Sequence, residues 1–372
     1  MNTPLRLVIL TPTALPHVTG NAMTAERWRR HLSKMGIVVQ VMETEHLDPS
    51  DFIDRLDHFH PHILHAHHIS RAGVLMLHPC VADKYGTMPL VVSPAGTDIN
   101  LCAMRGAGRE QVGKVCAMAR CIISQSAATT RLLQELLPDL KEGIAYVPKA
   151  FFWLGKDRLD LRTVAGCREG DILFFMPAGI RPVKGNLECL AAMEKAHEVN
   201  PKIRVVFAGP AIDADYSARF AEMINRRGSF AAWILRIPPE AMGSAYESVD
   251  VVLNHSASEG LSNSLLEAMA AGRPVLASDI PGNRWLISDE EGAGPCGCLF
   301  NPSDRGDFIR QALRLANDAA FRASLSAGGR LRAAAWPDPS EEAHALADLY
   351  EAAVSGKGRL KTSSAPLHLY SC

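Results

Sequence analysis

The feature that most constrains the fold is a unit of two apolar segments joined by a polar loop and an alanine-rich stretch, between residues 249 and 278. The first segment, 249–253, is largely apolar and has the length of a buried strand. The alanine- and leucine-rich stretch that follows the loop ends at Gly272, as a helix does. A second apolar run, 274–278, comes next. A strand, a loop, a helix and a second strand in this order predict a parallel α/β sheet.

Two glutamates make this unit a candidate ligand site. Glu259 lies in the polar loop, and Glu267 lies eight residues further on, in the predicted helix. Ser262 or Asn263 is a natural helix N-cap, so the backbone N–H groups of the loop should point outward. Such groups at the positive end of a helix bind anions. Two carboxylates beside an anion site suggest a ligand with both phosphate and hydroxyl groups, such as a nucleotide sugar.

The same pattern of an apolar strand followed by a polar loop recurs along the chain, which predicts the α/β class throughout. We expect strands at 5–10, 37–41, 63–66, 89–93, 119–124 and 144–147, and then at 172–179, 203–208, 232–235, 249–253, 274–278 and 297–300. The opening strand, loop, helix and strand are Rossmann-like, although the G-x-G-x-x-G dinucleotide fingerprint is absent from them.

The length of 372 residues exceeds what one hydrophobic core comfortably supports, so we expect two domains. Residues 1–150 form the first Rossmann-like domain, 151–168 a linker, and 169–335 the second Rossmann-like domain. We expect the helical segment 336–354 to pack back on the first domain. The polar tail 355–372 is expected to be flexible.

The composition excludes several classes of function. The net charge is −1, so bulk electrostatics favours neither nucleic acid nor an anionic membrane. No apolar run reaches the ~18 residues that span a bilayer. The cysteines are nine in number and scattered, as in proteins with reduced thiols, and the apolar run 5–10 fits a first strand better than a signal peptide. We therefore expect a cytoplasmic protein. Peripheral membrane contact through the basic helix near residues 25–35 is an alternative that its interleaved apolar side chains do not favour.

A pair of cations follows the strand that ends at Gly179. Arg181 and Lys184 lie between this strand and the next helix. Two cations three residues apart beside glycines suit a diphosphate, since arginine offers a fork of donors and lysine a point charge. A solvated basic turn is the alternative. The next strand ends in the same glycine pattern, at Gly209 and Pro210.

Histidines and an aspartate follow strands of the first half. The segment 58–68 holds six histidines, but the spacing fixes no further metal ligand, so we favour a reading without metal. Ligands of open α/β sheets bind at the carboxyl ends of strands, which makes His67 or His68 the candidate on the acceptor side. Asp98 follows the next strand and suits a hydroxyl group or a helix cap.

Two further loops contain glycines. Gly20 and Asn21 follow the first strand and suggest either a close backbone approach at a site or an ordinary turn. The segment 108–115 nearly matches the phosphate-binding G-x-x-x-x-G-K-[ST], but Val115 replaces the serine or threonine and no strand precedes it. We interpret this segment as a helix surface.

With these residues in place, the chain resembles retaining glycosyltransferases of the GT-B fold, family 4, of the glycosyltransferase 1 domain-containing type. The resemblance covers about residues 5–350 and is strongest from 179 to 282. The E-x7-E motif of that family matches Glu259 and Glu267.

Three weaker motifs extend the resemblance. The R-x-x-x-K-G phosphate loop matches Arg181, Lys184 and Gly185, with one residue fewer between the cations. The glycine loop after the first strand matches Gly20-Asn21, and an H-x-H element matches His65-Ala66-His67.

The resemblance implies a fold of two Rossmann-like domains that face a central cleft, and it implies a role for each motif residue. Glu267 would hold the ribose hydroxyls of a nucleoside diphosphate sugar, Glu259 the hydroxyls of the transferred sugar, and the catalytic set would be Arg181, Lys184 and Glu259. The donor-binding residues expected from the motifs and strand ends are Gly20, Asn21, Gly179, Gly209, Pro210, Gly260, Leu261, Ser262, Asn263 and Glu267.

The implied reaction moves a hexose or N-acetylhexosamine from a nucleotide sugar, such as a UDP-sugar, to an unidentified acceptor with retention of configuration. Arg181 and Lys184 would neutralise the leaving diphosphate, so no metal and no cofactor are expected. The leaving phosphate would act as the base for the acceptor, and this mechanism needs no protein nucleophile.

One position departs from the family. Many relatives carry a histidine directly before the glycine of the loop after the fourth strand, and this chain has Ala95 there. In this chain no residue takes the role of that histidine beside the transferred sugar, or Asp98 or His67 takes it. The alternatives are a nucleotide-sugar epimerase, hydrolase or phosphorylase of the same fold, and a non-catalytic nucleotide-sugar-binding protein.

Overall fold

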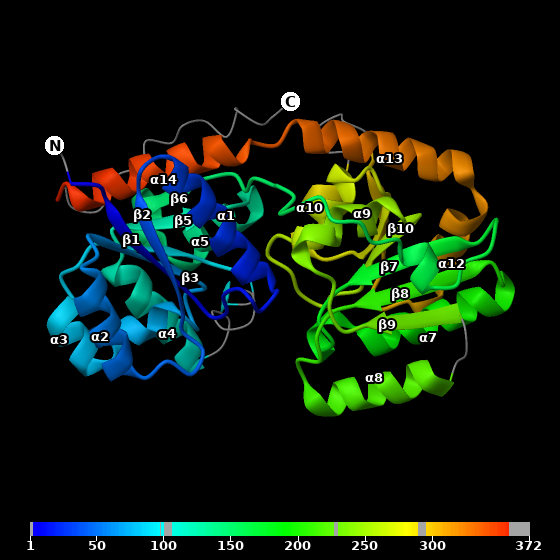
Figure 1. Cartoon of the computed structure of the whole chain (residues 1–372), viewed down its shortest axis with the longest axis horizontal. Coiled ribbons are helices and arrows are strands. Elements are labelled where there is room, and N and C mark those ends of the chain that lie inside the picture. The colour runs from blue at the N-terminus through cyan, green and yellow to red at the C-terminus, as the bar shows by residue number, and fades with distance from the viewer. Residues whose placement is uncertain (1–2, 97, 100–105, 227–229, 289–294, 357–372) are drawn as a thin grey trace. The chain divides into compact units, whose positions relative to one another are not determined.

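A computed structural model describes residues 3–96, 98–99, 106–226, 230–288 and 295–356 of the chain. The described residues form two compact units. The first contains those of Met1–Phe152 and of Trp336–Leu369, and the second contains those of Trp153–Ala335. In each unit a parallel sheet is covered by helices (Figure 1). The expected flexible tail lies, except for residues 355 and 356, outside the described residues.

The first unit is built on a sheet of six parallel strands in the order β2-β1-β3-β4-β5-β6. The strands are β1 (Arg6–Thr11), β2 (Val38–Glu43), β3 (Ile63–His67), β4 (Leu90–Ser93), β5 (Cys121–Ser124) and β6 (Ile144–Tyr146). The chain runs outward from β1 in one direction and from β3 in the other, so the switch point of this sheet lies between these two strands.

Helices cover both faces of the first sheet, because β1 is apolar on both sides. Leu7 and Ile9 belong to one core cluster and Val8 and Leu10 to another. The first cluster is completed by α1 (Gly20–Lys34) and α14 (Pro339–Val354). The second is completed by α2 (Pro49–Phe59), α3 (Pro79–Tyr85), α4 (Gly106–Met118), α5 (Ala127–Leu136) and the short helix η1 (Gly73–Leu77). A further short helix, η3 (Pro138–Gly143), precedes β6.

The second unit also contains six parallel strands, in the order β12-β11-β10-β7-β8-β9. Counted from β7, this is the Rossmann order 3-2-1-4-5-6, with its switch point between β7 and β10. The strands are β7 (Ile172–Pro177), β8 (Ile203–Ala208), β9 (Ala231–Ile234), β10 (Val251–Asn254), β11 (Val275–Ser278) and β12 (Gly297–Phe300).

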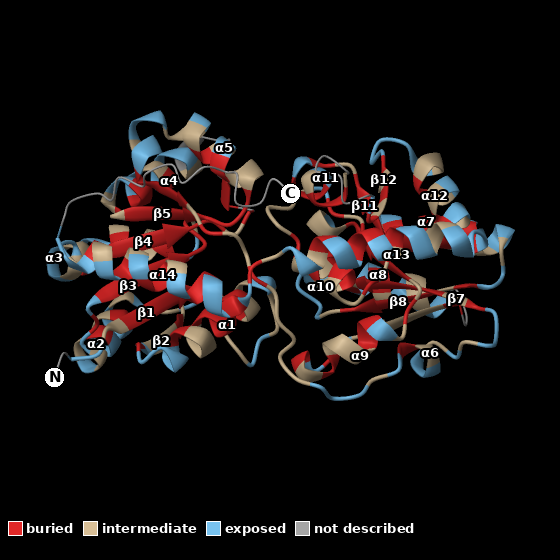
Figure 2. Ribbon diagram, turned by 90° about the horizontal axis from the view of Figure 1, so that it is seen from above, coloured by how far each residue is buried: buried red, intermediate tan, exposed pale blue. Residues whose placement is uncertain are grey.

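Helices likewise cover the second sheet, and the buried residues concentrate in the strands and on the helix faces that meet them (Figure 2). The helices are α6 (Leu161–Val164), α7 (Asn186–Val199), α8 (Ala214–Arg226), α9 (Met242–Glu247), α10 (Asn263–Ala270), α11 (Pro281–Ile287), α12 (Arg305–Asn317) and α13 (Ala319–Ala334). Two short helices are η4 (Pro182–Lys184) and η6 (Pro239–Ala241). The main core joins α7 and α12 to the sheet, through side chains such as Leu190, Phe308 and Phe174.

The predicted α/β class is confirmed, and a strand lies at each of the segments where the sequence pattern predicts one. The basic helix near residues 25–35 is α1, and one of its cations is buried. The guanidinium of Arg27 donates to both carboxylate oxygens of Glu342 in α14 at 2.6 and 3.0 Å. Gln125 donates to the same carboxylate at 2.7 Å. These buried polar contacts hold the C-terminal helix on the first unit.

Candidate functional site

The predicted cations and the first predicted glutamate lie at the switch point of the second sheet. Strands β7 and β10 are hydrogen-bonded neighbours, and the loops after their carboxyl ends carry Arg181 with Lys184 and Glu259 respectively. Ligands of doubly wound sheets bind at such a point, because the loops diverge there and leave space between them. The fold alone thus brings together residues that are 75 positions apart in sequence.

The central contact of this site is an ion pair. Lys184 Nζ donates to Glu259 Oε1 at 2.6 Å, and the two side chains are 19% and 11% exposed. The same oxygen accepts hydrogen bonds from Ser256 Oγ at 2.6 Å and from Asn254 Nδ2 at 3.2 Å. Burial alone would raise the pKa of Glu259, but Lys184 and these two donors together lower it below its ordinary value. Glu259 is therefore ionised and held in one orientation.

The loop that carries Lys184 has a backbone that only glycine adopts easily. Gly185 has φ of +63°, and a Cβ atom placed on it would lie 2.6 Å from both the carbonyl oxygen and Nδ1 of His255. Gly185 also precedes α7, so the close approach fixes the turn between Lys184 and that helix. Arg181 begins the same turn, and its backbone N–H donates to Asn186 Oδ1 at 3.2 Å.

Glu267 lies on α10 and has a different partner from Glu259. The hydroxyl of Tyr246 donates to Glu267 Oε2 at 2.7 Å. Tyr246 is fully buried, and burial together with this carboxylate raises the pKa of its hydroxyl well above the ordinary value. The hydroxyl thus stays protonated and orients Glu267, which is itself partly exposed.

The start of α10 fits the prediction of an N-cap at Ser262, but the cap is unusual. The side chain of Ser262 makes no capping hydrogen bond with a backbone N–H of the helix. It accepts instead from Asn254 Nδ2 at 3.1 Å and pairs with Ser264 Oγ at 2.9 Å. The serine therefore braces the loop against β10. Gly260, Leu261 and Asn263 are the other predicted residues of this segment, and they are partly exposed.

The remaining predicted residues of this unit lie at the ends of β7 and β8. Gly209 has φ of +155°, and a Cβ atom on it would collide with the carbonyl group of Ala178. Ile180 N–H donates to the carbonyl oxygen of Pro210 at 2.8 Å, so the two loops run side by side. This close packing of backbone explains the glycine pattern, and it places Gly179, Gly209 and Pro210 next to the turn of Arg181.

The sequence interpretation missed four residues that support this site. Asn254 ends β10, so the rule that polar residues follow strand ends applies to it. Ser256 follows two positions later. Gly282 packs against the backbone of Glu259, where a Cβ atom would collide with the carbonyl oxygen. Tyr246 gives no local signal, because its contact with Glu267 depends on how α9 packs against α10.

In the first unit Gly20, Asn21 and His67 follow or end β1 and β3, the strands of its switch point, and Asp98 follows the neighbouring strand β4. Gly20 is the first residue of α1, and Asn21 follows. The N-cap is Thr19, whose hydroxyl accepts from the backbone N–H of Ala22 at 3.2 Å. The helix has no acidic residue in its first turn, so its positive end is not neutralised by its own side chains.

His67 is buried and belongs to a hydrogen-bonded group. Its Nδ1 atom lies 2.9 Å from Ser93 Oγ, and His65 Nε2 lies 2.9 Å from the same oxygen. Trp28 stacks on His65 at 4.8 Å and meets His67 edge-on at 5.0 Å. His65 and His67 therefore bond to a serine and pack on a tryptophan. Within the described residues, no three His, Cys, Asp or Glu side chains are grouped closely enough to hold a metal ion.

Asp98 is fully buried and organises its own loop. It accepts from the backbone N–H of Ile69 at 2.7 Å and from that of Ala95 at 3.0 Å, and His68 Nδ1 lies 3.6 Å away. These contacts tie the loop after β4 to the loop after β3. The prediction that Asp98 meets the acceptor stays a prediction, as does the assignment of the role left open by Ala95.

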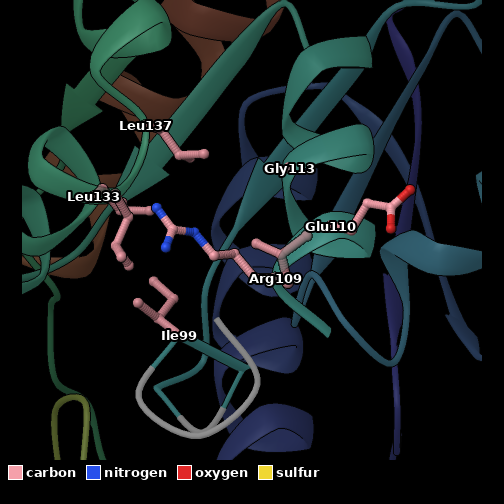
Figure 3. A pocket seen from close by; sticks show the side chains of 8 residues that line it. Ile99, Arg109, Glu110, Gly113, Leu133 and Leu137 are labelled. Carbon is pink, nitrogen blue, oxygen red and sulfur yellow. The ribbon is translucent and has the colours of Figure 1, made fainter. Parts of the chain in front are cut away.

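A concave pocket of about 380 Å³ lies between α4 and α5 of the first unit. Its lining is mostly apolar and includes Ile99, Val112, Leu133, Leu136 and Leu137. Figure 3 shows the guanidinium of Arg109 extending toward Leu133, whereas the carboxylate of Glu110 points away. The pocket lies at the segment that nearly matches a phosphate-binding loop, and its apolar walls do not suit a phosphate.

Comparisons with known proteins bear on both units. Residues 157–332, a little under half of the chain, match the sequence model of the family described as glycosyl transferases group 1. These residues fall within the second unit and include its switch point. A protein of Xenopus tropicalis described as glycosyltransferase 1 domain-containing protein 1 is 25% identical over 304 residues, which is 80% of this chain and 84% of that protein.

Solved structures share the fold of the whole chain. Sucrose-phosphate synthase from Thermosynechococcus elongatus superposes with a TM-score of 0.77 at 16% identity, over 95% of this chain and 100% of that one. HepE of Anabaena, in complex with UDP and glucose, superposes with a TM-score of 0.73 at 16% identity, over 94% of this chain and 100% of that one. The neighbours are GT-B glycosyltransferases, so the GT-B architecture predicted from the sequence is confirmed.

Proposed function

We propose that this chain moves a hexose or N-acetylhexosamine from a UDP-sugar to an acceptor with retention of configuration. The family match and the relatives support a glycosyltransferase of the GT-B fold. The proposal rests on one observation above all. At the switch point of a Rossmann-ordered sheet, an ionised carboxylate is held against a lysine, and a second carboxylate lies on the helix that begins beside it. The complex of HepE with UDP and glucose supports the choice of donor.

The two carboxylates take different parts of the donor. Glu267 is oriented by Tyr246 through one oxygen, and we assign it to the ribose hydroxyls, which are donors that a carboxylate accepts well. Glu259 Oε1 accepts hydrogen bonds from Lys184, Ser256 and Asn254, which fix the carboxylate beside Lys184, and we assign Glu259 to the hydroxyls of the transferred sugar. The segment from Gly260 to Asn263 lies between them and supplies backbone N–H groups for the distal phosphate.

Lys184 changes partner in this mechanism. Before the donor binds, its charge is neutralised by Glu259. A diphosphate that enters beside Lys184 and Arg181 draws the lysine toward its own oxygens, and the interaction strengthens as negative charge builds on the leaving group. The cations do what a metal does in other transferases, so we propose a reaction without metal or other cofactor. The leaving phosphate accepts the proton of the incoming acceptor on the face from which the sugar departs.

The acceptor is assigned to the first unit. Gly20 and Asn21, which we keep among the donor-binding residues, begin a helix whose positive end follows β1, and His67 lies at the neighbouring end of β3. We assign His67 and Asp98 to the acceptor side. The acceptor itself is a nucleophile of unknown chemical class.

A reducing compartment such as the cytoplasm suits the chain. The cysteines within the described residues form no disulfide, and several of them, among them Cys116, Cys121 and Cys189, are buried. No helix among the described residues is long and apolar enough to cross a membrane.

The function is tested by incubating the protein with UDP-glucose, UDP-N-acetylglucosamine or GDP-mannose, with and without a small-molecule extract as a source of acceptor. If the protein is a transferase, free nucleotide should appear only when both a matching donor and the extract are present. The release should persist in the presence of EDTA. The NMR coupling constant of the product should show the anomeric configuration of the donor. Release of nucleotide without extract identifies a hydrolase or a hydrolysing epimerase instead, and conversion of the donor into another nucleotide sugar identifies an epimerase that does not hydrolyse it. Binding of a nucleotide sugar with no turnover identifies a binding protein, the reading that Ala95 favours, and contradicts the proposal.

A further inference from the structure

Four side chains of the first unit form an unbranched chain of hydrogen bonds. Tyr350 Oη of α14 lies 2.6 Å from His65 Nδ1, and His65 Nε2 lies 2.9 Å from Ser93 Oγ. Ser93 Oγ lies 2.9 Å from His67 Nδ1. Tyr350, His65 and Ser93 are fully buried and His67 is 3% exposed. The chain connects the C-terminal helix to the residue at the carboxyl end of β3.

Each of the four groups has one proton that it can donate to a hydrogen bond. Burial lowers the pKa of His65 to about 3, and burial together with the neighbouring cations and histidines lowers the pKa of His67 well below its ordinary value. Both imidazoles are therefore neutral, with one N–H each. Burial raises the pKa of the Tyr350 hydroxyl, which stays protonated. Ser93 contributes a single hydroxyl hydrogen.

These protons fit the three bonds in one order. Within the described residues, the hydroxyls of Tyr350 and Ser93 have no hydrogen-bond partners other than His65 and His67. If His67 donated through Nδ1, either the hydroxyl hydrogen of Ser93 or that of Tyr350 would be buried without an acceptor, which costs about 1–3 kcal/mol. The order that leaves neither hydroxyl hydrogen unsatisfied runs from Tyr350 to His65, from His65 Nε2–H to Ser93, and from Ser93 to His67 Nδ1.

We infer that His67 is held as the Nε2–H tautomer and acts as a hydrogen-bond donor to a substrate oxygen, with Ser93, His65 and Tyr350 as its positioning residues. The donor role rests on the proposed function, whereas the tautomer does not. The Nε2 atom of His67 makes no hydrogen bond with the described residues and is not among the polar atoms that are buried without a partner, so solvent reaches it. With Nδ1 occupied by Ser93 and Nε2 protonated, His67 has no free lone pair and is not a general base.

Tyr350 is the most distant positioning residue, 285 positions from His65. It reaches the sheet because α14 is anchored on α1 by the buried pair of Arg27 and Glu342. Loss of the tyrosine hydroxyl removes the bond that sets the direction of the chain. His65 then no longer has a defined tautomer, and the direction of the Ser93 hydroxyl is no longer fixed.

The tautomer is measured directly by long-range ¹H–¹⁵N correlation spectra of the full chain with ¹⁵N-labelled histidine at pH 7.5, with His67→Asn for assignment. The wild type should show His67 protonated at Nε2 only. Ser93→Ala and Tyr350→Phe should each convert this signal into an average of the two tautomers. The matched control is Tyr85→Phe, which removes a tyrosine hydroxyl bonded to Asp57 on another helix of the same unit and should leave His67 unchanged.

Two results overturn the inference. One is a wild-type His67 protonated at Nδ1 or at both nitrogens, and the other is a wild-type signal that persists in Ser93→Ala or in Tyr350→Phe. A second readout covers variants that fold poorly. Once a turnover assay is established, Ser93→Ala should lower kcat about fivefold with the KM of the donor unchanged, and Ser93→Thr, which keeps the hydroxyl, should restore it. The spectra need no substrate. If the protein is not a transferase, the kinetic assay will show no turnover, but the spectra will still report the tautomer of His67.

Discussion

Removing the charge of Glu259 should strengthen the binding of UDP and weaken the turnover of the UDP-sugar. In the free protein Glu259 neutralises Lys184 across 2.6 Å. A nucleotide that recruits Lys184 must therefore compete with this carboxylate. In Glu259→Gln the competition is removed, while the side-chain oxygen still accepts from Ser256 and Asn254.

The size of the effect follows from that contact. A hydrogen bond between charged groups contributes about 1.5–3 kcal/mol net. The lysine side chain is 19% exposed, so solvent screens part of this energy, and the nucleotide recovers only a share of it. We expect UDP to bind about fivefold more tightly to Glu259→Gln, which corresponds to about 1 kcal/mol. Turnover should fall at least tenfold, or about 1.4 kcal/mol, because the variant no longer holds the sugar hydroxyls.

Isothermal titration calorimetry with UDP at physiological salt measures the first effect. Glu267→Gln is the matched control, since it removes the same charge from the other glutamate and should weaken UDP binding by about 1–3 kcal/mol through the ribose. Opposite signs for the two variants support the division of roles between the glutamates. Equal weakening of UDP binding in both would falsify it, because Glu259 would then also hold the nucleotide.

Three further perturbations test the framework of the site. Gly185→Ala should lower the unfolding midpoint by the equivalent of about 1–3 kcal/mol, because alanine is strained at positive φ and meets His255, and an unchanged midpoint would show that the turn relaxes freely. The pKa of His65 is about 3 in the folded protein and 6.5 in the unfolded chain. The unfolded chain therefore takes up the proton first, so the contribution of His65 to the free energy of unfolding is constant above pH 6.5 and falls on acidification toward pH 3. Between pH 6.5 and 5.0 urea unfolding of the first unit should show a loss of about 2 kcal/mol that is reduced in His65→Gln, and equal losses in both proteins would argue against a neutral buried imidazole. Arg27→Met should destabilise the first unit by about 3–5 kcal/mol, since Glu342 is left as a buried charge, and combining it with Glu342→Gln should recover part of that loss. A lower thermal unfolding midpoint for the double variant than for Arg27→Met would contradict this explanation.

Local patterns were sufficient to predict the strands and the loops of the candidate site. A strand in a parallel sheet is buried on both faces and therefore appears as a continuous apolar run, such as that of β7. The polar residues that follow each run identify the carboxyl edge of the sheet. This reasoning placed Arg181, Lys184 and Glu259 at strand ends, and sheet order then brings them together.

The partners of these residues depend on tertiary packing and are not visible in local patterns. The sequence predicted that Lys184 meets phosphate and that Glu259 meets sugar, but not that the two bind each other in the free protein. Tyr246 and Tyr350 resemble ordinary core residues in the sequence. Each has a buried hydroxyl that must find a partner, and only the packing of α9 and α14 determines that this partner is a residue of the candidate site.

A crystal structure of the full chain soaked with UDP tests the central claim most directly. The account predicts nucleotide density at the carboxyl ends of β7 and β10, with the ribose hydroxyls on Glu267 and the diphosphate beside Arg181 and Lys184. It also predicts that Lys184 Nζ moves away from Glu259 toward a phosphate oxygen. Nucleotide bound elsewhere, or bound here with the Lys184–Glu259 pair intact and Glu267 out of reach of the ribose, would contradict it.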